Sequence, residues 1–519
     1  MTILSYAPGG YHGHIVTVEV DCRLGIPGMD IVGLPASEVR EARERARVAI
    51  RNSGFEFPQK RILVNLSPAD VPKIGNGFDL SIAAAILASA GQLRSVSHEP
   101  VMVIGELHLD GTVGSVRGVL AAVAEGADNG VAAFVVPATN VDEARAVAGD
   151  RVAGIGSLSE MPVAIDRIAT DGSLATDCEA SDAWDTSKRA ALPAGTGALT
   201  DYAQLRGLSD VKRVLEIAVA GRHHVLVVGP PGAGKSAAMS LVPTIQPPLS
   251  RREAVEVTRI HSLAAEPGRP VGLLRHRPFR APHHNTSTEG LLGGRLPQIP
   301  GEVALAHCGT LFLDEALEFR RPVLQGLREP LEHRRVRVAR ARGNYWFPAA
   351  LQLILATNRC PCGMLGRRDR VCLCSVSEVD RYWRKLGGPL LDRIDLRLPV
   401  APKPLEQLPP TDSSGEIASR VRAAVAYRRS TRGQGVPNAC LTAESAQVAC
   451  SLTAAARSSF AHAAKAFGLS TRASLSVLRV ARTIADIAET ARVDETHVLE
   501  AVSYRRYGEV RPLWEADDS

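Results

Sequence analysis

The sequence predicts an α/β protein built from three folded parts, and three observations support this prediction. Strand-like runs alternate with helical stretches over residues 1–168, which is typical of an α/β domain. A short β-branched run enters a glycine-rich turn at residues 225–236, and we expect a second α/β domain around it over residues 201–400. Residues 401–519 follow helical periodicity and are expected to form a small helical domain.

Composition indicates a folded protein with several domains. The 519 residues, 45% of them hydrophobic, are enough for about three domains. The 61 basic and 55 acidic residues leave a net charge of +6, which is too mild to indicate an anionic partner by itself. Residues 1–20 lack the features of a secretory signal, and no apolar run is long enough to span a bilayer. We therefore expect a soluble, cytoplasmic protein without a membrane partner.

The first domain is expected to extend over residues 1–168. Its predicted strands are 15–20, 62–66, 101–104 and 133–136, and its predicted helices are 37–53, 80–90 and 119–129. Residues 169–200 are rich in Ala, Ser, Thr, Asp and Gly without apolar periodicity, and this composition predicts a flexible linker.

Four segments of the first domain resemble, in order and spacing, the proteolytic domain of Lon proteases, which has a ribosomal S5-like α/β fold. They are residues 72–75, 104–107, 110–113 and 117–119. In that family a serine nucleophile and a lysine base follow the first and last of these segments, but the matching positions here hold residues 78–80 and Leu120. A peptidase dyad needs a hydroxyl and an amine within hydrogen-bond reach. We expect no peptidase activity, with Ser81 and Lys73 as an alternative, offset dyad.

The glycine-rich turn after the run at 225–228 has the sequence context of a phosphate-binding loop, because it lies between a strand and a helix start. Its glycines let the backbone approach a polyphosphate, and the helix N-terminus favours negative charge. Lys235 is expected to reach the β- and γ-phosphates of ATP, and the Ser236 hydroxyl to ligate Mg²⁺. The predicted nucleotide-binding residues are Gly229, Pro230, Pro231, Gly232, Ala233, Gly234, Lys235 and Ser236.

Polar residues at the ends of two further apolar strands complete the predicted ATP site. Asp314 and Glu315 follow the run 310–313; Asp314 is expected to hold Mg²⁺ and Glu315 to deprotonate the attacking water. Asn358 follows the run 351–356 and could hold that water or the γ-phosphate. An acidic turn and a strand-capping Asn are the alternatives, but the carboxylate pair combined with a phosphate loop favours hydrolysis.

The ordered set of these motifs resembles the magnesium-chelatase-like group of AAA+ ATPases, and nearly the whole chain is similar to the YifB/ComM family. Further matching segments are 31–35, 65–70, 280–284, 391–393, 470–473 and 480–486. The resemblance implies a sensor-1 role for Asn358, an arginine finger acting on a neighbouring subunit for Arg393, and a sensor-2 role for Arg472. From its sequence alone, Arg393 could equally form a surface ion pair. Arg359 follows the sensor where the group often has proline.

The same resemblance implies a ring, usually a hexamer, with ATP at the subunit interfaces. It implies a motor that acts on single-stranded or branched DNA, with a role in branch migration during homologous recombination and natural transformation. The alternative is a ring that remodels a protein or inserts a metal, as the magnesium-chelatase relatives do.

Arginines alternate with small apolar residues over 334–342, so one face of a strand in the predicted hairpin should be basic. The arginines Arg335, Arg337, Arg340 and Arg342 could follow a DNA backbone, with the aromatic residues 345–347 available for base stacking. A charged sheet edge that discourages aggregation is the alternative.

Four of the nine cysteines form two closely spaced Cys-x-Cys pairs: Cys360, Cys362, Cys372 and Cys374. Four thiolates could hold a structural Zn²⁺ in tetrahedral geometry. A cluster of free or redox-active thiols is the alternative.

Residues 401–519 are expected to form a helical lid. The predicted helices are 416–432, 454–467, 473–490 and 495–507, with Asp494 as the N-cap of the last. Arg472 precedes the third helix, where it would couple the nucleotide state to the lid angle.

Overall fold

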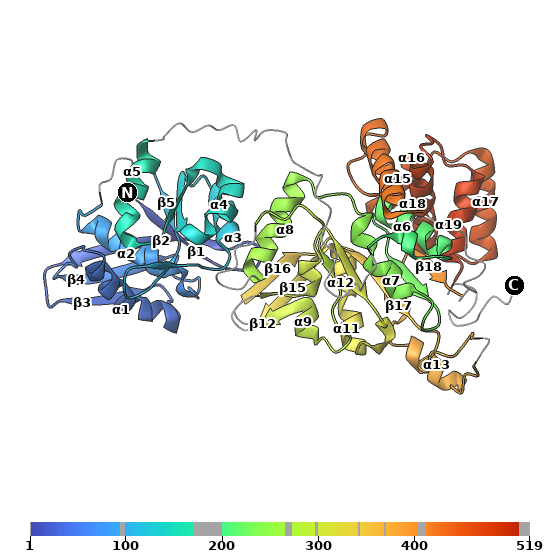
Figure 1. The fold of residues 1–519 in the computed structure, drawn as a ribbon, viewed down its shortest axis with the longest axis horizontal. Coiled ribbons are helices and arrows are strands. Elements are labelled where there is room, and N and C mark those ends of the chain that lie inside the picture. The colour runs from blue at the N-terminus through green and yellow to red at the C-terminus, as the bar shows by residue number, and fades with distance from the viewer. Residues whose placement is uncertain are drawn as a thin grey trace.

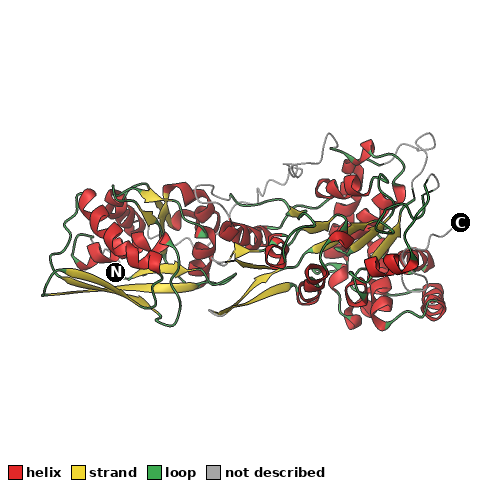
Figure 2. Cartoon of the chain, turned by 90° about the horizontal axis from the view of Figure 1, so that it is seen from below, coloured by secondary structure: helices red, strands yellow, loops and turns green. Residues whose placement is uncertain are grey.

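The structure is a computed structural model that describes residues 2–93, 99–170, 200–264, 272–295, 299–340, 343–367, 370–401 and 412–507. It confirms the α/β fold class, with two separate main sheets followed by a helical C-terminal region. The molecule is elongated: the N-terminal domain lies at one end, the phosphate-loop domain in the middle and the C-terminal helices at the other end (Figures 1 and 2).

The N-terminal domain is built on a seven-stranded mixed sheet in the order β3-β4-β2-β1-β5-β8-β9. The strands are β1 Ile3–Ala7, β2 His14–Arg23, β3 Gly28–Val32, β4 Arg61–Ser67, β5 Val101–Val103, β8 Ala133–Pro137 and β9 Val152–Ile155, with a small hairpin of β6 Glu106–Leu107 and β7 Val113–Gly114. The helices are α1 Ser37–Asn52, α2 Asp79–Ser89, α3 Val119–Asp128, α4 Val141–Ala148 and α5 Met161–Thr170. Helix α5 therefore extends into the predicted linker, and the rest of that segment, 171–199, lies outside the described residues.

The offset peptidase dyad is not assembled in the N-terminal domain. Lys73 and Ser81 are fully buried and donate to separate backbone carbonyls, those of Pro68 and Phe78. Asp79 is also buried, and its carboxylate accepts a hydrogen bond from Arg45 Nε at 2.7 Å. Lys73 and Ser81 therefore do not form the hydrogen-bonded pair that the offset dyad requires.

The middle domain contains a five-stranded parallel sheet in the order β11-β14-β17-β10-β18. Its strands are β10 Val225–Val228, β11 Phe279–Arg280, β14 Thr310–Leu313, β17 Gln352–Thr357 and β18 Leu396–Pro399. Two hairpins accompany it, β12 Gly293–Arg295 with β13 Ile299–Pro300 and β15 Arg335–Arg340 with β16 Gly343–Pro348. The helices are α6 Ser209–Gly221, α7 Lys235–Ser240, α8 Arg251–Ala264, α9 Thr288–Leu292, α10 Glu302–Leu305, α11 Arg321–Gly326, α12 Arg328–His333, α13 Val376–Trp383 and α14 Gly388–Leu391.

This parallel sheet positions the candidate site. Strands β10, β14 and β17 are buried along their whole length, as their continuous apolar sequences require. Because parallel strands end at the same edge, the residues that follow these three strands meet there.

The C-terminal region is helical, as predicted, and covers the side of the middle domain formed by α6 and β18 (Figure 1). Its helices are α15 Ser414–Ala426, α16 Ala443–Cys450, α17 Ala454–Ala466, α18 Thr471–Ile487 and α19 Glu495–Arg505. Asp494 is confirmed as an N-cap, since its side chain accepts a hydrogen bond from the amide of His497.

The N-terminal domain packs directly on the middle domain, a contact that the linker composition did not predict. The Arg259 guanidinium of α8 lies 4.6 Å from the centre of the Tyr11 ring and pairs with Glu125 of α3. The Tyr11 amide donates to the Trp346 carbonyl at 3.0 Å. One apolar core runs through both domains.

Candidate active site

The loop between β10 and α7 has the backbone that a phosphate-binding loop requires. Gly232 and Gly234 adopt φ angles of 81° and 76°, in the left-handed region that glycine tolerates best. Gly229 lies against β18, where an added Cβ would stand 2.6 Å from the Val400 carbonyl oxygen. The glycines are therefore needed for the conformation of the loop and for its close packing.

A cavity of about 370 Å³ opens over this loop. It is lined by residues 231–237 of the loop and helix, by Asp314 and Glu315 after β14, and by Thr357 and Asn358 at the end of β17. The structure thus gathers the predicted loop, carboxylate pair and sensor around one space. The roles assigned to these side chains remain predictions.

Lys235 lies at the floor of the cavity, with 7% of its surface exposed. Its ammonium donates to the carbonyls of Gly229 at 2.6 Å and Pro230 at 2.8 Å, and to Asn358 Oδ1 at 3.4 Å. Burial lowers the pKa of Lys235 to about 8, although the charges of Asp314 and Glu315 oppose that shift. A bound phosphate would replace neutral carbonyls with negative charge at this ammonium.

Glu315 occupies a strained position beside the cavity. Its φ angle of 47° is left-handed, which is unusual for a residue with a side chain and is common at functional sites. The Asp314 carboxylate accepts a hydrogen bond from the Glu315 amide at 3.0 Å. His284 Nδ1 lies 3.9 Å from Glu315 Oε2, a placement that sequence reasoning missed; the only signal was that His284 lies in the matching segment 280–284.

The donor set fits Mg²⁺. The Ser236 hydroxyl and the Asp314 carboxylate line the same cavity and offer oxygen ligands, which Mg²⁺ prefers. When bound, the ion would neutralise charge on the β- and γ-phosphate oxygens.

Arg393 and Arg472 do not line the cavity of their own chain. Arg393 pairs with Glu332 of α12 and donates to the Pro389 carbonyl. Arg472 is exposed at the start of α18. The hydrogen bond from Arg393 and the charges of both arginines lower the pKa of Glu332, so the two arginines lie near the same carboxylate.

The four clustered cysteines are brought together directly after the sensor. The Sγ atoms of Cys360, Cys362 and Cys372 lie 3.4 to 3.6 Å apart, and the Cys374 Sγ is within 4.8 Å of them all. Zn–S bonds of about 2.3 Å place the sulfurs of a tetrahedral site about 3.8 Å apart, so this set fits zinc. An added Cβ at Gly363, between the two pairs, would stand 2.8 Å from Pro231, and this loop therefore packs on the phosphate loop.

The arginine hairpin has the predicted period of two. Val336 and Val338 are buried, whereas Arg335 and Arg337 are exposed. Arg340 is the last residue of β15 and the position of its side chain is not described; Arg342 lies outside the described residues.

The expectation of three stacking aromatics on the hairpin is wrong for two of them. Tyr345 and Phe347 are buried, with 7% and 1% exposure, because they alternate with Trp346 on β16. Trp346 is 40% exposed, and its ring lies 5.6 Å from that of Tyr11 in the N-terminal domain.

Among the described residues, no helix has both the length and the apolar character needed to cross a membrane.

Comparisons with known proteins agree with these features. Family models match residues 201–408 (magnesium chelatase, subunit ChlI), 18–140 (subunit ChlI of Mg-chelatase) and 411–505 (magnesium chelatase, subunit ChlI C-terminal). YifB of Escherichia coli is 37% identical over 508 residues, covering 96% of this chain and 95% of the relative. The competence protein ComM of Haemophilus influenzae is 36% identical over 516 residues, covering 97% of both chains. An uncharacterized protein of Mycobacterium tuberculosis is 39% identical over 431 residues, covering 83% of this chain and 82% of the relative. The chain therefore belongs to the YifB/ComM family of magnesium-chelatase-like AAA+ proteins.

Proposed function

We propose that this chain is an ATP-hydrolysing ring motor of the cytoplasm that acts on single-stranded or branched DNA, in branch migration during homologous recombination and natural transformation. The observation that best supports ATP hydrolysis is that the phosphate loop, Asp314, Glu315 and Asn358 line the same cavity. The exposed arginines of β15 support the DNA part of the proposal. Similarity to a relative named competence protein adds support for the pathway.

The placement of Arg393 and Arg472 supports assembly into a ring, most simply a hexamer. Both lie near Glu332 rather than among the residues that line their own cavity. In the proposed ring they would face the γ-phosphate held by a neighbouring subunit, where arginine stabilises the charge of the transition state.

A second candidate is a ring that remodels a protein or inserts a metal ion. The match of three ChlI models along the chain is the finding that favours it. Stimulation of the ATPase by a porphyrin or a protein partner, but not by DNA, would select this candidate.

The proposed DNA contact predicts a specific salt response. If Arg335 and Arg337 each neutralise one phosphate of a single strand, replacing both with Ala should reduce the steepness of log affinity against log salt by roughly 1.4. Fluorescence anisotropy with labelled single strands of two unrelated sequences measures this slope, and both sequences should respond alike. Basal ATPase activity should be retained because neither arginine lines the ATP cavity.

Arg61→Ala is the matched control for this experiment, since Arg61 is an exposed arginine, at 66%, on β4 of the N-terminal domain. It should leave the slope unchanged. If the double variant at Arg335 and Arg337 has the same slope as the parent, the hairpin is a charged sheet edge and does not contact DNA through these arginines.

The environment of Lys235 predicts that ATP affinity depends on pH. Among the protein groups alone the pKa of Lys235 is about 8, and bound phosphates must raise it because they favour the ammonium. Below pH 8 the affinity should be flat, whereas above pH 8 binding must take up a proton and the affinity should fall by up to about tenfold per pH unit. Isothermal titration calorimetry in buffers of different ionisation enthalpy measures both effects. Lys235→Arg stays charged and should lose the pH dependence; an unchanged profile in this variant would assign it to another group.

The cysteine cluster predicts bound zinc. Protein purified without oxygen should contain about one zinc per chain, because four clustered thiolates complete the coordination shell. Cys362→Ser with Cys372→Ser should lose the metal, whereas Cys22→Ser, at a distant free cysteine, should keep it. Elemental analysis gives the answer, and metal-free protein that still hydrolyses ATP at the normal rate would assign the cluster to free thiols.

A further inference from the structure

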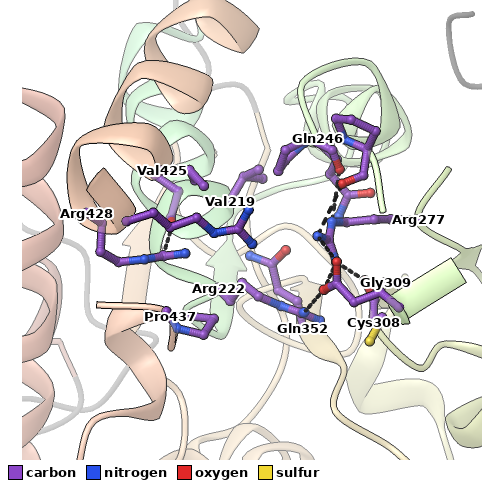
Figure 3. Close-up of a pocket in the computed structure, with 16 residues that line it drawn as sticks. Val219, Arg222, Gln246, Arg277, Cys308, Gly309, Gln352, Val425, Arg428 and Pro437 are labelled. Carbon is purple, nitrogen blue, oxygen red and sulfur yellow. Dashed lines mark hydrogen bonds and ion pairs between the residues drawn. The ribbon is translucent and has the colours of Figure 1, made fainter. Parts of the chain in front are cut away.

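A second polar cavity lies at the opposite edge of the parallel sheet from the phosphate loop. Arg222, Gly309 and Gln352 line it at the amino ends of β10, β14 and β17. The lid closes its other side with Val425, Arg428 and residues of the turn near Pro437 (Figure 3). The cavity is therefore shared by the middle domain and the lid.

Positive charge dominates the lining of this cavity. Four arginines and one carboxylate take part: Arg222, Arg277, Arg428, Arg429 and Glu253. Arg277 is already matched, because it pairs with Glu253 at 3.0 Å and donates to the Cys308 carbonyl at 2.7 Å (Figure 3). Burial pushes the pKa of Glu253 upward, but the charge and hydrogen bonds of Arg277 hold it at about 2, which indicates a strongly cationic surrounding. Arg222 also lies 3.8 Å from Glu253 and donates to the Ala350 carbonyl at 2.7 Å, so this one carboxylate serves two of the four arginines in the lining.

Arg428 is the residue that most clearly indicates a bound anion. It is 4% exposed, and its guanidinium donates to the Ala220 carbonyl at 3.2 Å, while its buried Nε has no hydrogen-bond partner among the described residues. Burial, together with the charge of Arg429, lowers the pKa of Arg428 to about 10. The carboxylate that most opposes this shift, Asp486, is paired with Arg432 and Arg482. A buried cation without a counter-ion is costly, and an anion in the cavity would remove that cost.

The size of the cavity limits the ligand. Its volume is about 140 Å³, and a water molecule occupies roughly 30 Å³, so the space equals about five waters. That is enough for a tetrahedral oxyanion with one or two waters and too little for a nucleotide. Guanidinium groups match the oxygens of phosphate in geometry and charge.

We propose that this cavity is a binding site for a free oxyanion of the phosphate class, separate from the ATP site. Arg428 of the lid and Arg222 of the middle domain hold the anion between them, so that its binding stabilises the contact between the two domains. The site does not depend on any interaction with DNA.

The test uses the full-length chain carrying Lys235→Ala, so that the phosphate loop does not contribute. Equilibrium dialysis with labelled orthophosphate, at an ionic strength held constant with sodium chloride, should show saturable binding of about one phosphate per chain. Sulfate should compete. Adenosine monophosphate should not, and competition by it as effective as that of orthophosphate would contradict the size argument.

Variants then assign the site. Arg428→Gln should lower phosphate affinity by roughly tenfold or more, as expected for a lost charge-assisted hydrogen bond. Because Arg428 is buried and its replacement could impair folding, Arg429→Gln provides a second, exposed variant, for which we also expect weaker binding. Arg61→Gln should bind like the parent. The proposal is overturned if saturable binding is absent, or if the folded Arg428→Gln and Arg429→Gln proteins bind phosphate with the affinity of the parent.

Discussion

Glu315→Gln is expected to bind ATP as the parent does and to hydrolyse it roughly 10² to 10⁴ times more slowly, the usual contribution of a general base. The substitution removes the proton acceptor but keeps the shape of the side chain in the cavity. Single-turnover hydrolysis, together with ATP binding measured separately, distinguishes loss of chemistry from loss of affinity.

Two further variants sharpen this experiment. Lys235→Ala should lose nucleotide binding itself, since Lys235 is the buried cation beneath the site expected to hold the phosphates. Glu318→Gln is the control, because Glu318 is exposed three residues further on and does not line the cavity. If Glu315→Gln hydrolyses ATP at the rate of the parent, Glu315 is not the general base.

Arg393→Ala is expected to lower turnover by roughly 10³-fold with little change in ATP affinity, because an arginine finger acts on the transition state. The reason to expect action on a neighbour is structural: Arg393 is not among the residues that line the cavity of its own chain. In the isolated chain it is paired with Glu332, so that assembly would have to exchange one anionic partner for another.

Mixing two inactive variants tests this arrangement directly. In a mixed ring, some interfaces combine an intact Glu315 from the Arg393→Ala subunit with an intact Arg393 from the Glu315→Gln subunit. Activity should therefore return in part when the two proteins are mixed. If both variants assemble and the mixture stays inactive, Arg393 acts within its own chain or has only a structural role. Arg384→Ala, at an exposed arginine directly after α13, should remain fully active alone.

The sequence predicted which residues gather around the phosphate-loop cavity, because their placement follows from local rules. An apolar run that ends in a glycine-rich turn or a polar residue marks the end of a buried strand, and parallel strands bring such ends together. The proximity of Lys235, Asp314 and Asn358 could therefore be predicted without knowing how distant segments pack. Periodicity also predicted the exposed face of β15 and the lid helices α15, α17, α18 and α19, but it missed the short helix α16.

Features that depend on packing between distant segments could not be read from the sequence. Tyr345 and Phe347 looked available for stacking, but strand alternation on β16 turns both into the core. Arg259 contacts Tyr11 and so joins two domains, although the chain segment that connects these domains has the composition of a flexible linker. The oxyanion cavity likewise collects Arg222 and Arg428 from opposite ends of the ATPase region, and no sequence motif connects them.

The most direct test of the proposed function is the steady-state ATPase rate of the purified full-length protein, measured with and without single-stranded and branched DNA over a range of salt. We expect DNA to stimulate the rate, the stimulation to fall steeply as salt rises, and branch migration to require hydrolysable ATP. A rate that DNA leaves unchanged at low salt, but that a porphyrin or a protein partner increases, would contradict the proposal.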